Sequence, residues 1–164
     1  MTNHTPVESA LRVAMEARDL TAIVGTFAPE AELWSPLTAQ FTFKGSEEIT
    51  AIIEVILDVF EDFHYTDELM GERNGFLVAR ARVGGVDIEM VDHIIYDADG
   101  RIAEFTVFFR PLPAAAVALR LIGAGLARRR SPARAAVIST LARPLGFMTK
   151  TGDAIGARLV RSVV

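Results

Sequence analysis

Cysteine is absent from the 164-residue sequence, which excludes disulfide bonds and thiolate chemistry. Histidine is scarce, and His4, His64 and His93 do not cluster in the sequence. We therefore expect no metal site built on histidine and no bound cofactor. Long apolar runs are also missing, because the helical run at 114–127 is too short for a comfortable membrane span.

The composition indicates one domain with a substantial core, since 51% of the residues are hydrophobic and 23% are charged. The first residues lack the basic start and the apolar run of a secretory signal, and Glu8, Glu16 and Asp19 follow early. We therefore expect a cytoplasmic location.

Charge is divided unevenly along the chain. Residues 1–112 hold 8 Lys or Arg and 20 Asp or Glu, whereas residues 113–164 hold 9 Lys or Arg and a single Asp. This asymmetry predicts an acidic body, residues 1–112, followed by a basic, apolar helical extension, residues 113–164.

The pattern of the extension predicts three helices. An apolar run covers 114–127, and Ser131 with Pro132 can begin a second helix. That helix is expected to end at "RPLG" (143–146), and Asp153 is expected to cap the last one.

The body begins with helical patterns and continues with strand patterns. Apolar spacing predicts a helix over 6–18, a short second helix capped by Asp19, and a long helix in "KGSEEITAIIEVILDVF" that Ser46 can cap. "AELWSPLTAQFTF" (31–43) predicts a short strand, a turn marked by proline, and another strand or loop. From Phe63 the apolar period changes to two, and turns rich in Gly, Asn and Asp separate four antiparallel strands at about 63–71, 76–84, 86–97 and 101–110.

Asp92 interrupts the apolar phase of the third of these long strands. Alternation places Asp92 on the same face as Met90 and Ile94. An acid in that position must find a partner, stay protonated, or line a cavity. The opposite face carries His93, which is expected on the outer surface.

Arg80 and Arg82 share a face of the preceding strand and are expected to pair with Glu89 or Asp87 across the hairpin.

This order of elements predicts an α+β fold, because the helices must cover the apolar face of the sheet. Three passages, "EARDLTAIVGTFAPEAELWSP", "FKGSEEITAII" and "VDHIIYDADGRIAEFTVFFRP", carry a resemblance that covers about residues 6–112. They resemble the nuclear transport factor 2-like superfamily, in its ketosteroid isomerase and SnoaL-like polyketide cyclase branch. The resemblance implies a cone: a curved antiparallel sheet packed on three helices, with a pocket at the wide end and the helical extension beyond it.

In ketosteroid isomerases, a tyrosine and a protonated aspartate form an oxyanion hole, and a second aspartate moves the proton. Asp92 matches the oxyanion-hole aspartate, and the "DH" pair is kept. The base falls at Ser35 and the tyrosine at Leu11, and neither residue can do that chemistry. Glu32 is a candidate replacement for the base, and Thr38 or Tyr65 for the hydroxyl.

We therefore expect Asp92 to be the catalytic residue, as acid, base or oxyanion donor. A small apolar ligand is expected to contact six further residues, namely Trp34, Ser35, Tyr65, Met90, Phe105 and Phe109. Three functions stay open: an isomerase- or cyclase-like enzyme acting on a steroid- or polyketide-like molecule, a lipid- or steroid-binding module without turnover, and a structural homodimer.

The basic extension has three possible roles. It can pack on the acidic body as a lid, join a dimer interface, or lie on an anionic membrane surface. Nucleic acid is not expected as a partner, because the body is acidic and the extension has only Phe147 as an aromatic residue.

Overall fold

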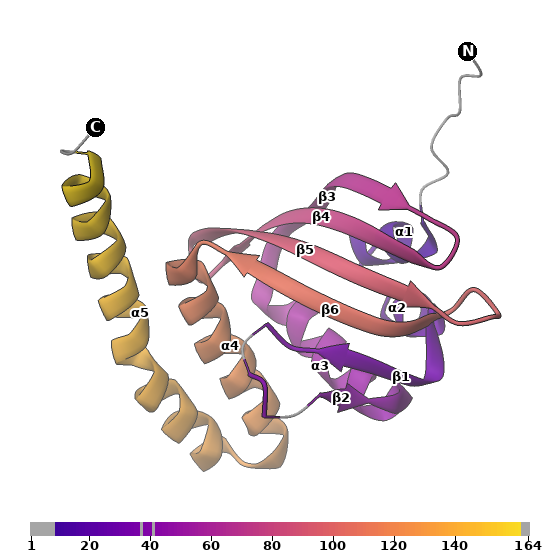
Figure 1. Ribbon diagram of the computed structural model, residues 1–164. Helices are drawn as coiled ribbons and strands as arrows, with labels where there is room; N and C mark the ends of the chain where they lie inside the picture. The colour runs from indigo at the N-terminus through magenta and orange to yellow at the C-terminus, as the bar shows by residue number, and fades with distance from the viewer. Residues whose placement is uncertain (1–8, 37, 41, 162–164) are drawn as a thin grey trace.

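Five helices and a six-stranded sheet make up the computed structural model, which describes residues 9–36, 38–40 and 42–161 (Figure 1). The N-terminal helix was predicted to begin at residue 6, and residues 6–8 and His4 lie outside these ranges. The elements are α1 (Ala10–Glu16), α2 (Leu20–Gly25), β1 (Phe27–Trp34), β2 (Phe43–Lys44), α3 (Gly45–Val59), β3 (Phe60–Met70), β4 (Asn74–Val83), β5 (Val86–Tyr96), β6 (Ile102–Arg110), α4 (Leu112–Arg130) and α5 (Pro132–Arg161).

The sheet has the strand order β2-β1-β6-β5-β4-β3 and curves without closing (Figure 1). All neighbouring strands are antiparallel except β1 and β6, which run parallel. The predicted α+β class with a curved sheet is confirmed. Helices α1, α2 and α3 lie against one face of the sheet, and α4 packs beside α3 on the same side (Figure 1).

Local sequence signals explain how the first helices begin. Ser9 caps α1 by accepting a hydrogen bond from the Arg12 amide. Asp19 caps α2 by accepting one from the Ala22 amide, and this second cap was predicted. The expected cap at Ser46 is wrong, because α3 begins at Gly45 with Lys44 as its N-cap. The Glu48 carboxylate accepts the Lys44 amide hydrogen at 2.8 Å, which satisfies the backbone donor of the N-cap residue itself.

The tight connection between β4 and β5 depends on two glycines. Gly84 and Gly85 have φ angles of +55° and +80°, a region that side chains with a Cβ rarely adopt. Two successive residues of this kind match the twist of a two-residue hairpin. The turn fixes the register that pairs Met90 with Ala79 and Asp92 with Leu77.

The concave face of the sheet forms the core. In β5, Ile88, Met90, Asp92 and Ile94 are all buried, so the predicted alternation is correct. Asp92 is only 4% exposed and is the one charged side chain that the structure buries among the residues it describes.

The convex face carries the polar partners that the sequence predicted. Arg80 pairs with Glu89 at 3.0 Å, and Arg82 pairs with Asp87 at 3.4 Å. On this face the His93 ring also stacks on Phe76, with ring centroids 4.6 Å apart.

The extension forms two helices rather than three. α5 continues from Pro132 to Arg161 through Pro144, so neither "RPLG" nor Asp153 marks a helix boundary. Propensity is a local preference, and the helix continues through these signals although most of its residues beyond Pro144 are exposed. The two helices approach closely at Gly123, where an added Cβ would lie 3.1 Å from Cγ2 of Ile138.

Two glycine-to-alanine substitutions should have opposite effects on stability, because Gly125 packs on α3 whereas Gly156 in α5 has free space around it. In Gly125→Ala the new Cβ would meet Val55 Cγ1 at 2.6 Å, whereas Gly156 in α5 has nothing within 4 Å. We expect Gly125→Ala to lower the free energy of unfolding by about 1 kcal/mol, as overpacking outweighs the gain in helix propensity. Gly156→Ala should raise helix stability by up to about 1 kcal/mol. Chemical denaturation measures both, and a stabilised Gly125→Ala variant would contradict this packing.

Candidate functional site

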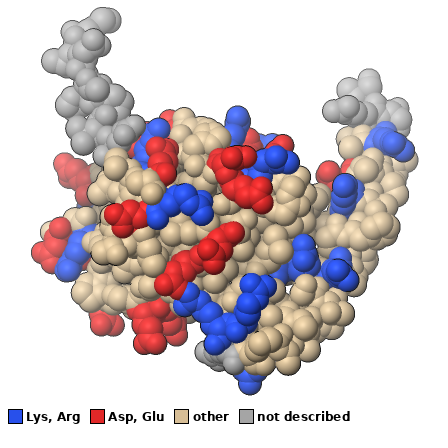
Figure 2. Space-filling model, turned by 180° about the vertical axis from the view of Figure 1, so that it is seen from behind, with Lys and Arg blue, Asp and Glu red and all other residues tan. Residues whose placement is uncertain are grey.

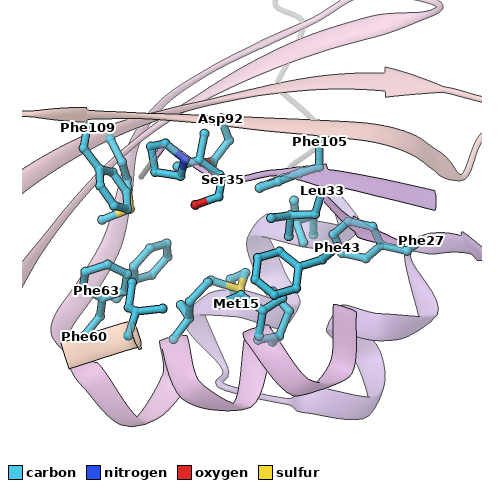
Figure 3. A pocket seen from close by; sticks show the side chains of 18 residues that line it. Met15, Phe27, Leu33, Ser35, Phe43, Phe60, Phe63, Asp92, Phe105 and Phe109 are labelled. Atoms are coloured by element: carbon cyan, nitrogen blue, oxygen red, sulfur yellow. The ribbon is translucent and has the colours of Figure 1, made fainter. Parts of the chain in front are cut away.

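A cavity of about 50 Å³ lies between the concave face of the sheet and the helices (Figure 3). Its wall is almost wholly apolar, with Asp92 and Ser35 as the two lining residues that have polar side chains. Strands β1, β5 and β6 form one side, and α1 and α3 form the other. The lining residues are Leu11, Met15, Phe27, Leu33, Ser35, Pro36, Phe43, Ile52, Ile53, Ile56, Phe60, Phe63, Met90, Asp92, Phe105, Val107, Phe109 and Ile122.

The Asp92 carboxyl group accepts a hydrogen bond from Tyr65, which was predicted to contact the ligand but lies behind Asp92 and is not among the residues that line the cavity. The Tyr65 hydroxyl donates to Oδ2 of Asp92 at 3.2 Å, and both side chains are buried. The two residues come from β5 and β3, which lie on either side of β4 in the sheet. Thr38 and Tyr65 were the two predicted sources of a hydroxyl group, and Tyr65 is the one that donates to Asp92.

Burial changes the acidity of both groups. Loss of hydration raises the pKa of the Asp92 carboxyl from 3.8 to about 7, and the hydrogen bond from Tyr65 opposes part of that rise. Burial and the neighbouring Asp92 carboxyl raise the pKa of the Tyr65 hydroxyl well above 10. Tyr65 therefore stays a donor, whereas Asp92 changes its charge near neutral pH.

The two positions that depart from the ketosteroid isomerase pattern both face the cavity. Leu11 lines it from α1, and Ser35 lines it just after the end of β1 (Figure 3). Met90, Phe105 and Phe109 also line the cavity, as the sequence predicted.

Trp34 lies elsewhere, and this assignment is corrected. Alternation along β1 buries Leu33 and turns Trp34 to the opposite face, where it is 45% exposed and outside the cavity wall. Glu32 is also directed away and pairs with Lys44 at 2.6 Å. The Thr38 hydroxyl accepts a hydrogen bond from the Gln40 amide within its own turn. Neither residue lines the cavity in place of the missing groups.

Sequence reasoning missed most of the helical side of the wall. The apolar stripe of α3 was visible, but its spacing alone does not separate residues that fill a core from those that face a cavity. Ile52, Ile53 and Ile56 belong to this group, and Ile122 reaches the wall from α4. Among the described residues, no cluster of His, Cys, Asp or Glu is placed to hold a metal ion.

The family model of the SnoaL-like domain matches residues 7–105. These residues include α1 to α3, β1 to β5 and the first part of β6, whereas Val107, Phe109 and Ile122 of the cavity wall lie beyond them. The chain therefore belongs to the SnoaL-like family, within the nuclear transport factor 2-like fold that the resemblance indicated. No curated protein matches the chain.

Solved structures support the same fold. A steroid delta-isomerase from Pseudomonas aeruginosa is 29% identical, with a TM-score of 0.63, covering 78% of this chain and 96% of its own. A protein with a cystatin-like fold from Silicibacter pomeroyi is 24% identical, with a TM-score of 0.67, covering 76% and 86%. A SnoaL-like polyketide cyclase from Shewanella denitrificans, described as putative in its name, is 12% identical, with a TM-score of 0.51, covering 62% and 85%.

The raised pKa of Asp92 predicts that stability falls as pH rises. Unfolded Asp92 releases its proton near pH 4 and folded Asp92 near pH 7, so the folded state binds more protons between these values. The free energy of unfolding should therefore fall by about 4 kcal/mol across this window and stay low above it.

Asp92→Asn should remove that dependence in urea denaturation at about pH 5 and about pH 8. Glu104→Gln, on the exposed face of β6, is the control. An unchanged pH dependence in Asp92→Asn would contradict the burial of an ionisable carboxyl.

Removing the Tyr65 hydroxyl should raise the pKa of Asp92 further. The Tyr65 hydrogen bond stabilises the carboxylate, so Tyr65→Phe leaves the charged form less favourable in the buried site. Carbon-13 NMR of the Asp92 carboxyl measures the shift directly. A lower pKa in Tyr65→Phe would show that another donor replaces the hydroxyl.

Proposed function

We propose that the chain binds a small, largely apolar molecule in the cavity, with a polar atom of the ligand beside Asp92. The observation that carries this proposal is a buried carboxyl group with a pKa of about 7 on a wall that is apolar apart from Asp92 and Ser35. Strongly shifted acids in cavities are typical of binding and catalytic sites.

Asp92 suits proton transfer at neutral pH. A general acid or base works best when its pKa lies close to the working pH, and Asp92 meets that condition. As a carboxylate it accepts a proton from the ligand, and as an acid it donates one to a ligand oxygen. The Tyr65 hydroxyl holds the carboxyl in one orientation throughout.

The wall limits the chemistry of the ligand. Asp92 and Ser35 offer hydrogen bonds at one side, while aromatic and aliphatic side chains surround the rest. A ring system or chain of carbon atoms with one oxygen or one acidic C–H group fits this arrangement. Steroid- and polyketide-like molecules have that character, and the related steroid delta-isomerase supports the assignment.

A ligand of that size requires the wall to move. Pockets for such molecules usually measure about 300–1,000 Å³, whereas this cavity measures about 50 Å³. Met15 and Met90 are unbranched and adapt readily to a new shape. Ile122 comes from α4 outside the family region, so displacement of α4 also enlarges the space.

Ser35 and Leu11 favour a second candidate, a carrier that binds without turnover. The isomerase pattern uses a second carboxylate and a tyrosine, and the cavity has neither at these positions. Catalysis would therefore rest on Asp92 alone, which both removes and returns the proton.

Binding and conversion of an unsaturated ketosteroid distinguish the enzyme from the carrier. We expect a β,γ-unsaturated 3-ketosteroid to bind the wild-type chain, as measured by calorimetry, and Asp92→Asn to retain binding. Conversion to the conjugated ketone, followed by ultraviolet absorbance, should fall at least about 100-fold in Asp92→Asn. Ser35→Asp restores a base beside the cavity and should raise the rate by about 100-fold or more.

Each result has a distinct meaning. Binding without conversion, even in Ser35→Asp, supports the carrier. Conversion that depends on Asp92 supports the enzyme. Absence of binding to the folded wild-type chain contradicts the ligand proposal, and Glu104→Gln serves as the folded control.

A further inference from the structure

α5 carries an exposed apolar stripe that the cavity does not explain. Five residues form the stripe, and they are between 43% and 75% exposed: Val137, Leu141, Leu145, Met148 and Ile155. At 100° per residue they lie within one quarter of the helix circumference. The stripe is about 27 Å long.

The opposite side of α5 carries most of its basic residues together with the exposed Phe147, whereas Arg134 lies on the stripe side. Arg143, Lys150 and Arg158 are exposed and lie about 90–170° around the helix from the centre of the stripe. From Pro132 to Arg161 there are five Lys or Arg and a single acid, Asp153. In Figure 2, basic side chains are spaced along this helix at the right, while acidic ones gather on the body.

The body does not cover the stripe. α4 is the main neighbour of α5 among the described elements, and Ala135 and Ser139 face that side. The C-terminal half of α5 diverges from the body (Figure 1). Pro144, Gly146 and Gly152 are poor helix formers, so a surface that supports this half would stabilise it.

A second copy of the helix fits the stripe poorly. Helices that pair through such a stripe usually carry opposite charges beside it. Ala142, Thr149 and Thr151 lie there instead, and Gly152 leaves a gap within the stripe. Pairing would also bring two strongly basic helices together.

We infer that α5 lies on the surface of an anionic lipid bilayer, with the stripe in the acyl boundary and the basic side chains at the headgroups. Lipid chains fill the gap at Gly152, and negative headgroups complement the net charge. Insertion across the bilayer is not involved, since no helix within the described residues is both long and apolar enough to span it.

Vesicle flotation with the full chain tests this inference. We expect binding to vesicles of phosphatidylcholine and phosphatidylglycerol, little binding to phosphatidylcholine alone, and weaker binding at high salt. Leu141→Ser should weaken binding about tenfold. Arg143→Gln combined with Lys150→Gln should weaken it about thirtyfold. Circular dichroism checks that the variants fold.

Matched substitutions on the body are the controls. Val13→Ser removes a side chain that is 52% exposed on α1, and Arg73→Gln removes an exposed charge between β3 and β4, so both should bind as the wild type does. Absence of binding to the anionic vesicles overturns the inference, as does equal binding to both vesicle types. A dimer in solution that Leu141→Ser dissociates would assign the stripe to a second copy instead.

Discussion

The structure depends on one constraint: the curved sheet has an apolar concave face that must be covered. Helices α1, α2 and α3 cover most of it, and α4 packs against the remaining part beside α3. A flat sheet could be covered completely by closely packed helices. A curved sheet leaves space at its centre, and here that space is the cavity beside Asp92. The same geometry that builds the core therefore produces the candidate site.

That constraint also explains why Asp92 has unusual acidity. A carboxyl group on the concave face loses its hydration as soon as the sheet is covered, and the single neutral hydroxyl of Tyr65 replaces only part of it. A second carboxylate beside it would introduce repulsion as well. With Ser35 and Leu11 at the neighbouring positions, desolvation remains the dominant influence on Asp92. Asp92 is therefore the one strongly shifted acid of the cavity wall.

Much of this arrangement could be predicted from the sequence, because alternation and helical spacing are local properties. The period of two placed Asp92 and Met90 on the buried face, and hairpin residues set the strand order around them. The prediction that Trp34 contacts the ligand was wrong, because the sequence of a short strand before a proline does not show which of two adjacent residues faces the cavity. The choice of Tyr65 over Thr38 also depended on contacts between strands that no local pattern encodes.

The prediction for α5 was wrong for a different reason, because strong local signals for a helix end were followed and the helix continues through them. Pro144 and Gly146 indicate a helix end, yet the helix continues to Arg161, and the close approach of Gly123 to Ile138 aligns its first part along α4. α4 in turn contributes Ile122 to the cavity wall and contacts the β4–β5 turn at Gly84 through Val117 and Leu121. One helix therefore contacts both the cavity and the helix that carries the exposed stripe.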